Sequence, residues 1–362
     1  MKRSTAVVGL VALGALSLSA CGSDNNGSKS NASGSKIACA TGDLKGAGST
    51  FQKNIVSQWI KDYTDACSGA TLDYQGIGSG AGIKQFGAGT IDFAGSDSTM
   101  KPDEQAAADK TCGSPALHLP VTAGGIAVAY NLPSVKDLQL SPKTLAGIFQ
   151  GTITKWDDAL IKADNPSATL PSTAITAVHR EDSSGTTKVF SSFLDKTAGG
   201  DWKLGADKEL TWPASVQGAK GSDGVTQAVA GAEGAITYVE KSFVDASTTL
   251  AAAKVQNSAG TYATLSSASV SAALAGATTA ANGGDIKVSI DATAIKGDAY
   301  PITAVSYEIV CSKGKDATKT ALLKSFLTYA VGDGQNQADA NGYAPLPSAL
   351  ATQVKASVAA LS

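Results

Sequence analysis

Residues 71–86, TLDYQGIGSGAGIKQF, contain the pattern from which the fold is predicted. Thr71–Tyr74 is typical of a short strand, and the glycine-rich stretch Gly76–Gly80 follows it as a turn. Ile83 and Phe86 then lie three residues apart, which places both side chains on one face of a helix. The segment therefore predicts a strand, a turn and a helix in succession.

The same succession of strand, Gly/Ser/Thr turn and helix occurs three times in the chain. The three turns are Gly46–Phe51, Gly76–Gly80 and Ser183–Thr186. A helix start has unpaired backbone N–H groups and a partial positive charge, and glycine lets an anion approach the backbone closely. One such turn alone is better explained by ordinary N-capping with Ser or Thr. Three of them together favour a shared anion site.

Short apolar strands and amphipathic helices alternate from Thr41 to the C-terminus, and no linker separates the two halves. This alternation predicts an α/β fold. Two lobes can still form if the chain crosses between them twice, near Gly124–Gly125 and again near Tyr300–Pro301. The paired glycines tolerate the dihedral changes that a hinge needs.

Composition excludes several classes of function. The 362 residues carry 29 basic and 31 acidic side chains, a net charge of -2, so a general nucleic-acid-binding surface is not expected. His118 and His179 are the only histidines, and no C-x-x-C pair occurs. Metal centres, metal cofactors and histidine-based catalytic triads are therefore disfavoured.

Residues 1–20 are typical of a secretory signal peptide. Lys2 and Arg3 give a basic start, and Ala6–Ala20 is an apolar stretch that is too short to span a membrane. The mature protein is therefore expected outside the cytoplasm.

The end of this segment, Leu18–Cys21, resembles the bacterial lipobox, which implies that Cys21 receives lipid and becomes the mature N-terminus. Ordinary cleavage beside an unmodified cysteine is the alternative. Residues 21–40 are expected to form a tether, because Gly22–Lys36 has no apolar side chain larger than alanine. We expect a lipoprotein anchored to the cell membrane.

Four cysteines remain after Cys21, and an even number in an oxidising compartment predicts two disulfides. They are Cys39, Cys67, Cys112 and Cys311. Spacing alone allows three pairings. Cys39 and Cys67 each precede a predicted strand, which favours Cys39–Cys67 together with Cys112–Cys311.

A dinucleotide fingerprint is a competing interpretation of the second turn. Gly76-x-Gly78-x-x-Ala81 follows a strand, and Asp97 lies about twenty residues further on. The match is weak because the third position is alanine, and a protein outside the cytoplasm meets little dinucleotide. No G-x-x-x-x-G-K-[ST] motif occurs.

The chain resembles the phosphate-binding lipoproteins of bacterial high-affinity phosphate ABC importers, the PstS family. The resemblance covers nearly the whole chain after the tether and keeps the family's order. The matching segments are GAGSTF (46–51), YQGIGSGAGIKQF (74–86), DFAGSD (92–97), IFQGTITKWDD (148–158), R-x-D-x-SGT (180–186), GAITYVE (234–240), YPIT (300–303) and GYAPLP (342–347).

This resemblance implies a two-lobed periplasmic-binding-protein fold of type II that closes over one phosphate. The first lobe is expected to comprise residues 41–125 and 303–362, and the second residues 126–302. By motif position, the residues implied to bind phosphate are Thr50, Phe51 (through its backbone N–H), Ser79, Asp97, Arg180, Ser184, Gly185 and Thr186. Asp182 matches the acid that pairs with the arginine.

Asp97 matches the family's proton acceptor. An ionised carboxylate only accepts hydrogen bonds, so it repels an anion that brings no proton. HPO₄²⁻ and H₂PO₄⁻ carry such a proton, whereas sulfate at neutral pH does not. Asp97 is therefore expected to discriminate between these anions. A helix cap at Asp97 is the alternative role.

Three positions depart from the family pattern. Ser49 stands where many members have alanine, Gln52 replaces a frequent proline, and Ser183 stands where glycine is common. None of these departures removes an expected ligand.

We expect a monomeric binding protein that takes up inorganic phosphate, with arsenate as a mimic, and delivers it to the permease of an ABC importer. A secreted phosphatase or serine hydrolase that uses Ser184 or Ser79 is the first alternative, but it lacks an evident base. A surface adhesin without a tight phosphate site is the second.

Overall fold

The structure is a computed structural model that describes residues 37–362. The expected signal peptide, the lipidation site Cys21 and the tether as far as Lys36 lie outside the described residues. Within residues 37–362, no helix has the length and apolar character needed to cross a membrane.

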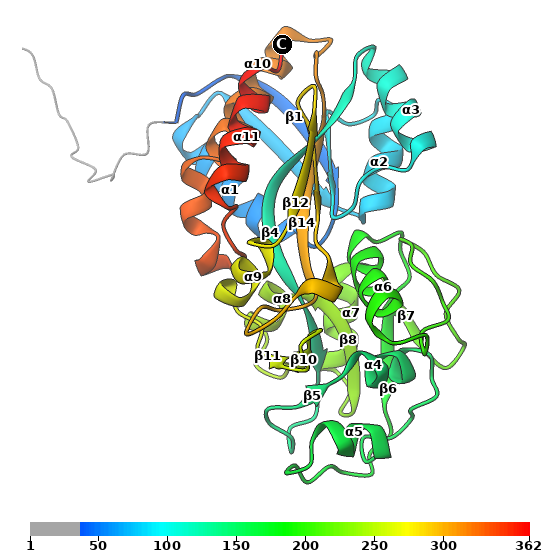
Figure 1. Ribbon diagram of the computed structural model, residues 1–362. Coiled ribbons are helices and arrows are strands. Elements are labelled where there is room, and N and C mark those ends of the chain that lie inside the picture. Colours follow the sequence, from blue (N-terminus) through cyan, green and yellow to red (C-terminus); the bar gives the residue numbers. More distant parts are fainter. Residues whose placement is uncertain (1–36) are drawn as a thin grey trace, which may run out of the picture. The chain divides into compact units, whose positions relative to one another are not determined.

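One mixed sheet runs through the whole body and determines where everything else lies (Figure 1). Its strand order is β2-β1-β3-β14-β4-β8-β6-β7, with β9 also paired to β4. The strands are β1 (Gly42–Gly48), β2 (Ala70–Gly76), β3 (Phe93–Ser96), β4 (Ala116–Tyr130), β6 (Thr176–Arg180), β7 (Gln217–Ala219), β8 (Ala235–Glu240), β9 (Ala251–Ala252) and β14 (Thr303–Cys311).

β4 connects the two parts of this sheet. All fifteen of its residues are buried, and it pairs with β14 over Ala116–Gly125 and with β8 over Ile126–Tyr130. We call β1, β2, β3, β14 and the first part of β4 the first lobe, and β6, β7, β8 and the second part of β4 the second lobe. The first crossing between lobes is therefore a continuous strand rather than a loop.

Helices cover both lobes. Figure 1 shows α1, α10 and α11 on one side of the first-lobe strands and α2 and α3 on the other. The helices are α1 (Lys53–Ala66), α2 (Ser79–Gly87), α3 (Pro102–Cys112), α4 (Pro142–Phe149), α5 (Ala159–Asp164), α6 (Gly185–Thr197), α7 (Gly221–Ala230), α8 (Lys241–Asp245), α9 (Ser267–Leu274), α10 (Ala317–Ala330) and α11 (Ser348–Ala359), with 3-10 turns at Ala292–Ala294, Asp333–Gln337 and Asp339–Asn341.

The apolar periodicity explains why these helices form. In α1, Ile55, Val56, Trp59 and Tyr63 are buried at the spacing of one helix face. The helix begins at Lys53, two residues after the Gly/Ser/Thr turn ends. The turn therefore stays outside the helix and remains available at the junction of the lobes.

Gly124 and Gly125 have a packing role that the sequence did not indicate. Both lie inside the β4–β14 pairing, opposite Ala304 and Thr303. A Cβ at Gly125 would lie 2.1 Å from Leu265 Cδ1, and one at Gly124 would lie 2.9 Å from Phe51 Cζ. Their lack of side chains makes room for these neighbours.

One hairpin lies elsewhere than expected. β12 (Thr278–Asn282) and β13 (Asp285–Ser289) fall within the range expected for the second lobe, yet they pack on the first. Asp285 accepts hydrogen bonds from the backbone N–H of His118 and pairs with its ring Nδ1, both within 2.8 Å. The residue limits of the lobes otherwise stay a prediction. A further small sheet consists of β5 (Gln139–Leu140), β10 (Lys254–Gln256) and β11 (Tyr262–Ala263).

Both expected disulfides are present. Cys39–Cys67 ties the segment before β1 to the segment before β2, and Cys112–Cys311 ties the end of α3 to the end of β14. The pairing favoured from the sequence is confirmed. The two bonds differ in sequence separation, 28 residues against 199.

Removing the long-range disulfide should cost more stability than removing the short-range one. Loop-closure entropy assigns about 3.5 kcal/mol to the Cys39–Cys67 loop and about 5 kcal/mol to the Cys112–Cys311 loop. We expect the Cys112→Ala/Cys311→Ala protein to have the lower free energy of unfolding in urea. An equal or larger loss in Cys39→Ala/Cys67→Ala would contradict this order.

Candidate anion-binding site

The turn after β1 brings Ser49, Thr50 and Phe51 to the junction of the lobes. Gly48 has a φ of 148°, and a Cβ there would lie 2.1 Å from Gly95 O, so only glycine fits. The Thr50 hydroxyl lies 2.8 Å from Ser222 Oγ in the second lobe. The Phe51 N–H donates to Ser49 Oγ at 3.0 Å, whereas the resemblance implies that it faces the ligand.

The second turn places Ser79 at the start of α2, where its hydroxyl reaches the second lobe. Ser79 Oγ accepts a hydrogen bond from Gly185 N at 3.1 Å and a longer one, 3.4 Å, from Asp97 N. Gly78 precedes it with a φ of 94°. This conformation favours glycine, and it turns the chain from β2 into the helix.

The third turn starts α6 in the second lobe. Ser184 caps this helix, since its hydroxyl accepts from Thr187 N at 3.1 Å. A Cβ at Gly185 would lie 2.6 Å from Ser79 Oγ and 2.8 Å from Asp97 Cβ, so the close contact requires glycine. Thr186 Oγ1 donates to Asp97 Oδ2 at 3.2 Å. The helix start therefore lies directly against the first lobe.

Asp97 follows β3 and is only 4% exposed. Its Oδ1 accepts hydrogen bonds from Ser49 Oγ at 2.5 Å and Ser306 Oγ at 2.7 Å. Burial raises the pKa of Asp97, while these hydrogen bonds, the charge of Arg180 and the Thr186 hydroxyl oppose that rise. The result is a desolvated carboxyl group that gains a proton more readily than a surface aspartate.

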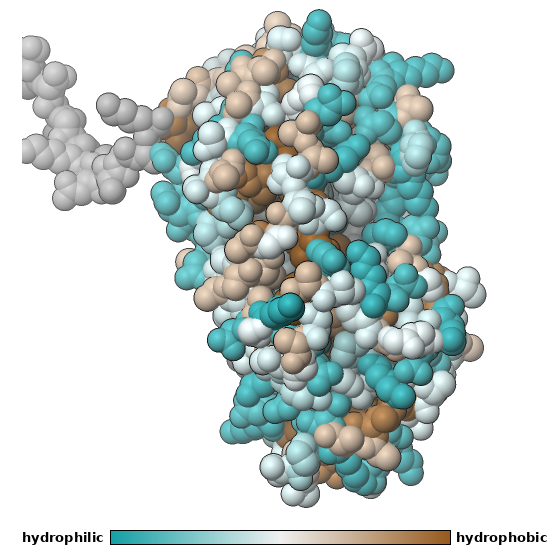
Figure 2. All heavy atoms as spheres, viewed as in Figure 1, coloured by the Kyte–Doolittle hydropathy of each residue, from teal (hydrophilic) through white to brown (hydrophobic). Residues whose placement is uncertain are grey.

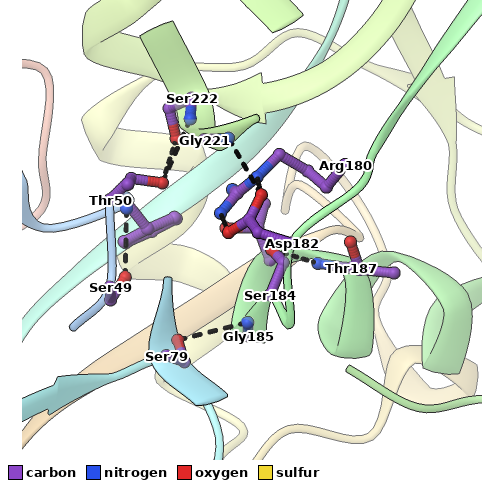
Figure 3. Close-up of polar contacts among 12 residues, drawn as sticks. Ser49, Thr50, Ser79, Arg180, Asp182, Ser184, Gly185, Thr187, Gly221 and Ser222 are labelled. Carbon is purple, nitrogen blue, oxygen red and sulfur yellow. Dashed lines mark hydrogen bonds and ion pairs between the residues drawn. The ribbon is translucent and has the colours of Figure 1, made fainter. Parts of the chain in front are cut away.

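Arg180 ends β6 and forms a two-pronged ion pair with Asp182 (Figure 3). Its Nε and Nη2 donate at 2.6 Å and 2.5 Å, and Asp182 Oδ1 also accepts from Gly221 N at 2.9 Å. Burial by itself would raise the pKa of Asp182, but Arg180 and the Gly221 N–H outweigh it and hold that pKa below its usual value. The pair fixes the guanidinium while leaving further N–H donors.

These residues come from distant parts of the chain but form one cluster (Figure 3). Hydrogen bonds across the lobes join Thr50 to Ser222, Ser79 to Gly185, and Asp97 to Thr186. All the side chains implied to bind phosphate by the resemblance lie at this junction, with hydroxyls and backbone N–H groups predominating. The geometry suits a small oxyanion that accepts many hydrogen bonds.

Three groups in the cluster were missed as site residues. Gly221 and Ser222 begin α7, and the segment KGSDG (220–224), with glycine and serine at this helix start, was a readable signal. Ser49 was noted only as a departure from the family. Ser306 gave no signal, because it lies within the buried run of β14 and only the fold aims it at Asp97.

Charged pairs also bridge the lobes around the site. Lys208 is 4% exposed, and its Nζ donates to Glu104 Oε1 at 2.7 Å and Oε2 at 2.8 Å. Its backbone oxygen accepts from Ser184 N at 3.0 Å, so the residue also contacts the start of α6. Lys53–Asp223 is another bridge, at 2.8 Å, but it is largely exposed.

Neither histidine is hydrogen-bonded to a side chain of the cluster, although the His179 ring Nδ1 lies 2.9 Å from the backbone oxygen of Arg180. His118 accepts from Met100 N through Nε2 and pairs with Asp285, while His179 stacks on Trp212. In the described part of the chain, no group of three or more His, Cys, Asp or Glu side chains could hold a metal ion.

Comparisons with known proteins identify relatives over the full length of the chain. The family model described as a PBP superfamily domain matches residues 33–333. Phosphate-binding protein PstS 3 of Mycobacterium tuberculosis is 40% identical over 369 residues, covering 100% of both chains. PstS 3 of Mycobacterium leprae is 41% identical over 99% of this chain and 98% of its own length.

Solved structures give the same fold. A high-affinity periplasmic phosphate-binding protein (PfluDING), solved with bound phosphate, superposes with a TM-score of 0.72 at 24% identity. The match covers 87% of this chain and 93% of that one. The two-lobed periplasmic-binding-protein fold is thereby established, and at full-length identities of about 40% the chain belongs to the PstS family of phosphate-binding proteins.

Proposed function

We propose that this protein captures inorganic phosphate outside the cytoplasm and delivers it to the permease of a phosphate ABC importer. One observation supports the ligand best. Asp97 is a buried carboxyl group in the midst of hydroxyl and N–H donors, with Arg180 opposite, an arrangement that suits an anion carrying its own proton. The full-length relatives that are named phosphate-binding proteins support the same ligand.

Binding without catalysis follows from what surrounds the two candidate nucleophiles. Ser184 Oγ caps α6, and Ser79 Oγ accepts backbone N–H groups; neither is hydrogen-bonded to a histidine or a lysine. A serine without a base is a weak nucleophile. We therefore propose capture and release without any bond cleavage.

The remaining expectations concern where and in what form the protein works. We propose that lipid on Cys21 anchors it to the outer face of the cell membrane and that it acts as a monomer, with arsenate as a phosphate mimic. Leu160 is the only large hydrophobic side chain exposed among residues 37–362, and Figure 2 shows hydrophobic residues scattered among hydrophilic ones. A surface of this kind suits a monomer.

Titration of phosphate-stripped protein with phosphate, arsenate and sulfate tests the proposed ligand directly. We expect calorimetric binding of phosphate and arsenate at one site and no measurable binding of sulfate. A protein that binds none of the three would refute phosphate capture and leave the adhesin interpretation.

Arg180 should contribute strongly to phosphate affinity. Losing a charged hydrogen-bond partner in a closed site should cost about 2–5 kcal/mol, and lysine cannot replace the planar fork. We expect both Arg180→Ala and Arg180→Lys to weaken phosphate binding in calorimetry. Lys143→Ala, an exposed lysine, is the control. An unchanged dissociation constant in Arg180→Ala would remove this residue from the site.

Asp97 should determine selectivity against sulfate. Wild type is expected to prefer phosphate by about 10⁴-fold, because sulfate brings no hydrogen to lie between its own anionic oxygen and the Asp97 carboxylate. In Asp97→Asn the amide NH₂ can face the anion, so the preference should shrink while phosphate still binds. Competition titrations at neutral pH and fixed salt measure the ratio. Equal ratios in the two proteins would show that Asp97 does not discriminate.

The buried Lys208–Glu104 bridge should slow phosphate release. Removing one partner of a largely buried ion pair leaves the other charge uncompensated and destabilises the contact between the lobes. We expect Lys208→Met to raise the dissociation rate by about tenfold or more in stopped-flow measurements. Lys53→Met removes the exposed bridge and should change the rate by less than about twofold. Identical phosphate dissociation rates in Lys208→Met and Lys53→Met would contradict the expected difference between the buried and the exposed ion pair.

A further inference from the structure

A second buried carboxyl group is linked to Asp97 by hydrogen bonds within the first lobe. Glu308 lies on β14, is 1% exposed, and accepts from Gln52 Nε2 at 2.7 Å through Oε1. Its Oε2 is buried without a hydrogen-bond partner. Gln52 Oε1 accepts from Ser306 Oγ at 2.8 Å, and Ser306 Oγ lies 2.7 Å from Asp97 Oδ1.

The packing of the first lobe fixes the position of the Gln52 side chain. The residue is fully buried at the N-cap of α1. A Cβ at Gly95 would lie 2.2 Å from Gln52 Nε2 and 2.1 Å from Tyr74 Oη, so Gly95 makes room for both polar groups. Tyr74 also accepts from Gln52 Nε2 at 3.1 Å.

This row of hydrogen-bonded side chains lacks one hydrogen unless one of its two carboxyl groups is protonated. Three contacts join Glu308, Gln52, Ser306 and Asp97 in that order. The serine hydroxyl has a single hydrogen, so it serves either Gln52 or Asp97 at any moment. One added proton completes all three contacts, and a buried contact between two acceptors would otherwise be costly.

That proton has two alternative places, which differ in the orientation of the Gln52 amide. With the proton on Asp97, the amide NH₂ faces Glu308 and Ser306 donates to Gln52. With the proton on Glu308, the amide oxygen faces Glu308 and Tyr74, the NH₂ faces Ser306, and Ser306 donates to Asp97. In this state the Tyr74 hydroxyl turns its hydrogen from Ser49 O to the Gln52 amide oxygen. Amide oxygen and nitrogen are nearly equal in size, so one side-chain position serves both orientations.

The charges around these hydrogen-bonded side chains favour the state with the proton on Glu308. Arg180 of the second lobe stabilises a negative charge on Asp97, whereas Glu308 faces only neutral Gln52 and, nearby, Tyr74 and Asp97 itself. Burial raises the pKa of Glu308 well above its usual value; Gln52 opposes this rise, and the charge of Asp97 adds to it. Burial and the charge of Glu308 likewise raise the pKa of Tyr74, so Tyr74 stays neutral.

We propose that Glu308 is a positioning residue for anion selectivity: it holds one proton and, through Gln52 and Ser306, directs a hydrogen bond onto Asp97 and keeps Asp97 an acceptor. The inference rests on the proposed phosphate binding. When rising pH removes this proton, Ser306 turns its hydrogen to Gln52, Asp97 loses a donor, and a second negative charge lies near the anion. Phosphate binding then weakens.

The test compares phosphate dissociation constants of wild type and Glu308→Gln from about pH 6 to the highest pH at which both stay folded. Glutamine imitates the protonated side chain, so the variant should keep its affinity at every pH. The ratio of the two constants cancels the ionisation of phosphate itself. We expect the wild-type dissociation constant divided by that of Glu308→Gln to be near one at the acid end. Where Glu308 ionises, this ratio should rise by up to tenfold per pH unit.

Glu240→Gln is the matched control. Glu240 is also fully buried, has one oxygen without a partner and has a pKa that burial raises well above its usual value, but it bonds to Ser242 rather than toward Asp97. Its ratio to wild type should not vary with pH. The substitution Gln52→Leu removes the hydrogen-bond connection between Glu308 and Ser306. It should weaken phosphate binding at neutral pH and remove the pH-dependent effect of Glu308→Gln.

The outcomes separate the inference from the function on which it rests. A wild-type/Glu308→Gln ratio that is constant over the whole folded range would overturn the role of Glu308, since a purely structural residue changes affinity equally at every pH. Should Glu308→Gln fail to fold, a wild type and a folded Gln52→Leu protein with the same affinity and the same pH profile would overturn it equally. Absence of phosphate binding by wild type would refute the proposed function and the inference together.

Discussion

Asp97 keeps its carboxyl group almost entirely out of water, so the protein itself must supply hydrogen-bond donors to it. Those donors come from three directions: Ser49 in the turn after β1, Ser306 in the middle of β14, and Thr186 at the start of α6. The first two belong to the first lobe and the third to the second. Satisfying this one carboxyl group therefore requires both lobes to be in place.

The positive charge of the site, the Arg180 guanidinium, is likewise held in place by hydrogen bonds within the second lobe. Asp182 holds Arg180 in a fixed orientation, and the start of α7 in turn holds Asp182 through the Gly221 N–H. A guanidinium fixed in this way loses little side-chain freedom when an oxyanion arrives. The site thus combines a fixed cation and a fixed acceptor, which suits an anion that is both charged and protonated.

Glycines at the junction allow this close approach between the lobes. Gly78, Gly80 and Gly185 each lie where a Cβ would overlap an atom of the other lobe. A single methyl group at such a position would hold apart the backbones that carry the donors. The glycine-rich turns are therefore required by packing as much as by the ligand.

Local sequence was sufficient for the parts of this protein that depend on neighbouring residues. The turns at 46–51, 76–80 and 183–186 and the helix face with Ile83 and Phe86 were predicted because helix periodicity and turn chemistry are short-range properties. The resemblance to a family then implied the cluster around Asp97 and Arg180. Disulfide pairing could be favoured but not decided from spacing.

Other features depended on contacts between segments that are far apart in the chain. Ser306 and Glu308 look like interruptions of a buried strand, and only the pairing of β14 with β3 and the packing of α1 bring them to Gln52 and Asp97. The same holds for the continuous β4 at the lobe crossing, for the hairpin 278–289 on the first lobe, and for Lys208 against Glu104. Sequence by itself determined the elements and their turns, because these follow from local backbone and side-chain preferences. The tertiary structure alone decided which buried polar groups share hydrogens, because that depends on distances between residues with no fixed separation in sequence.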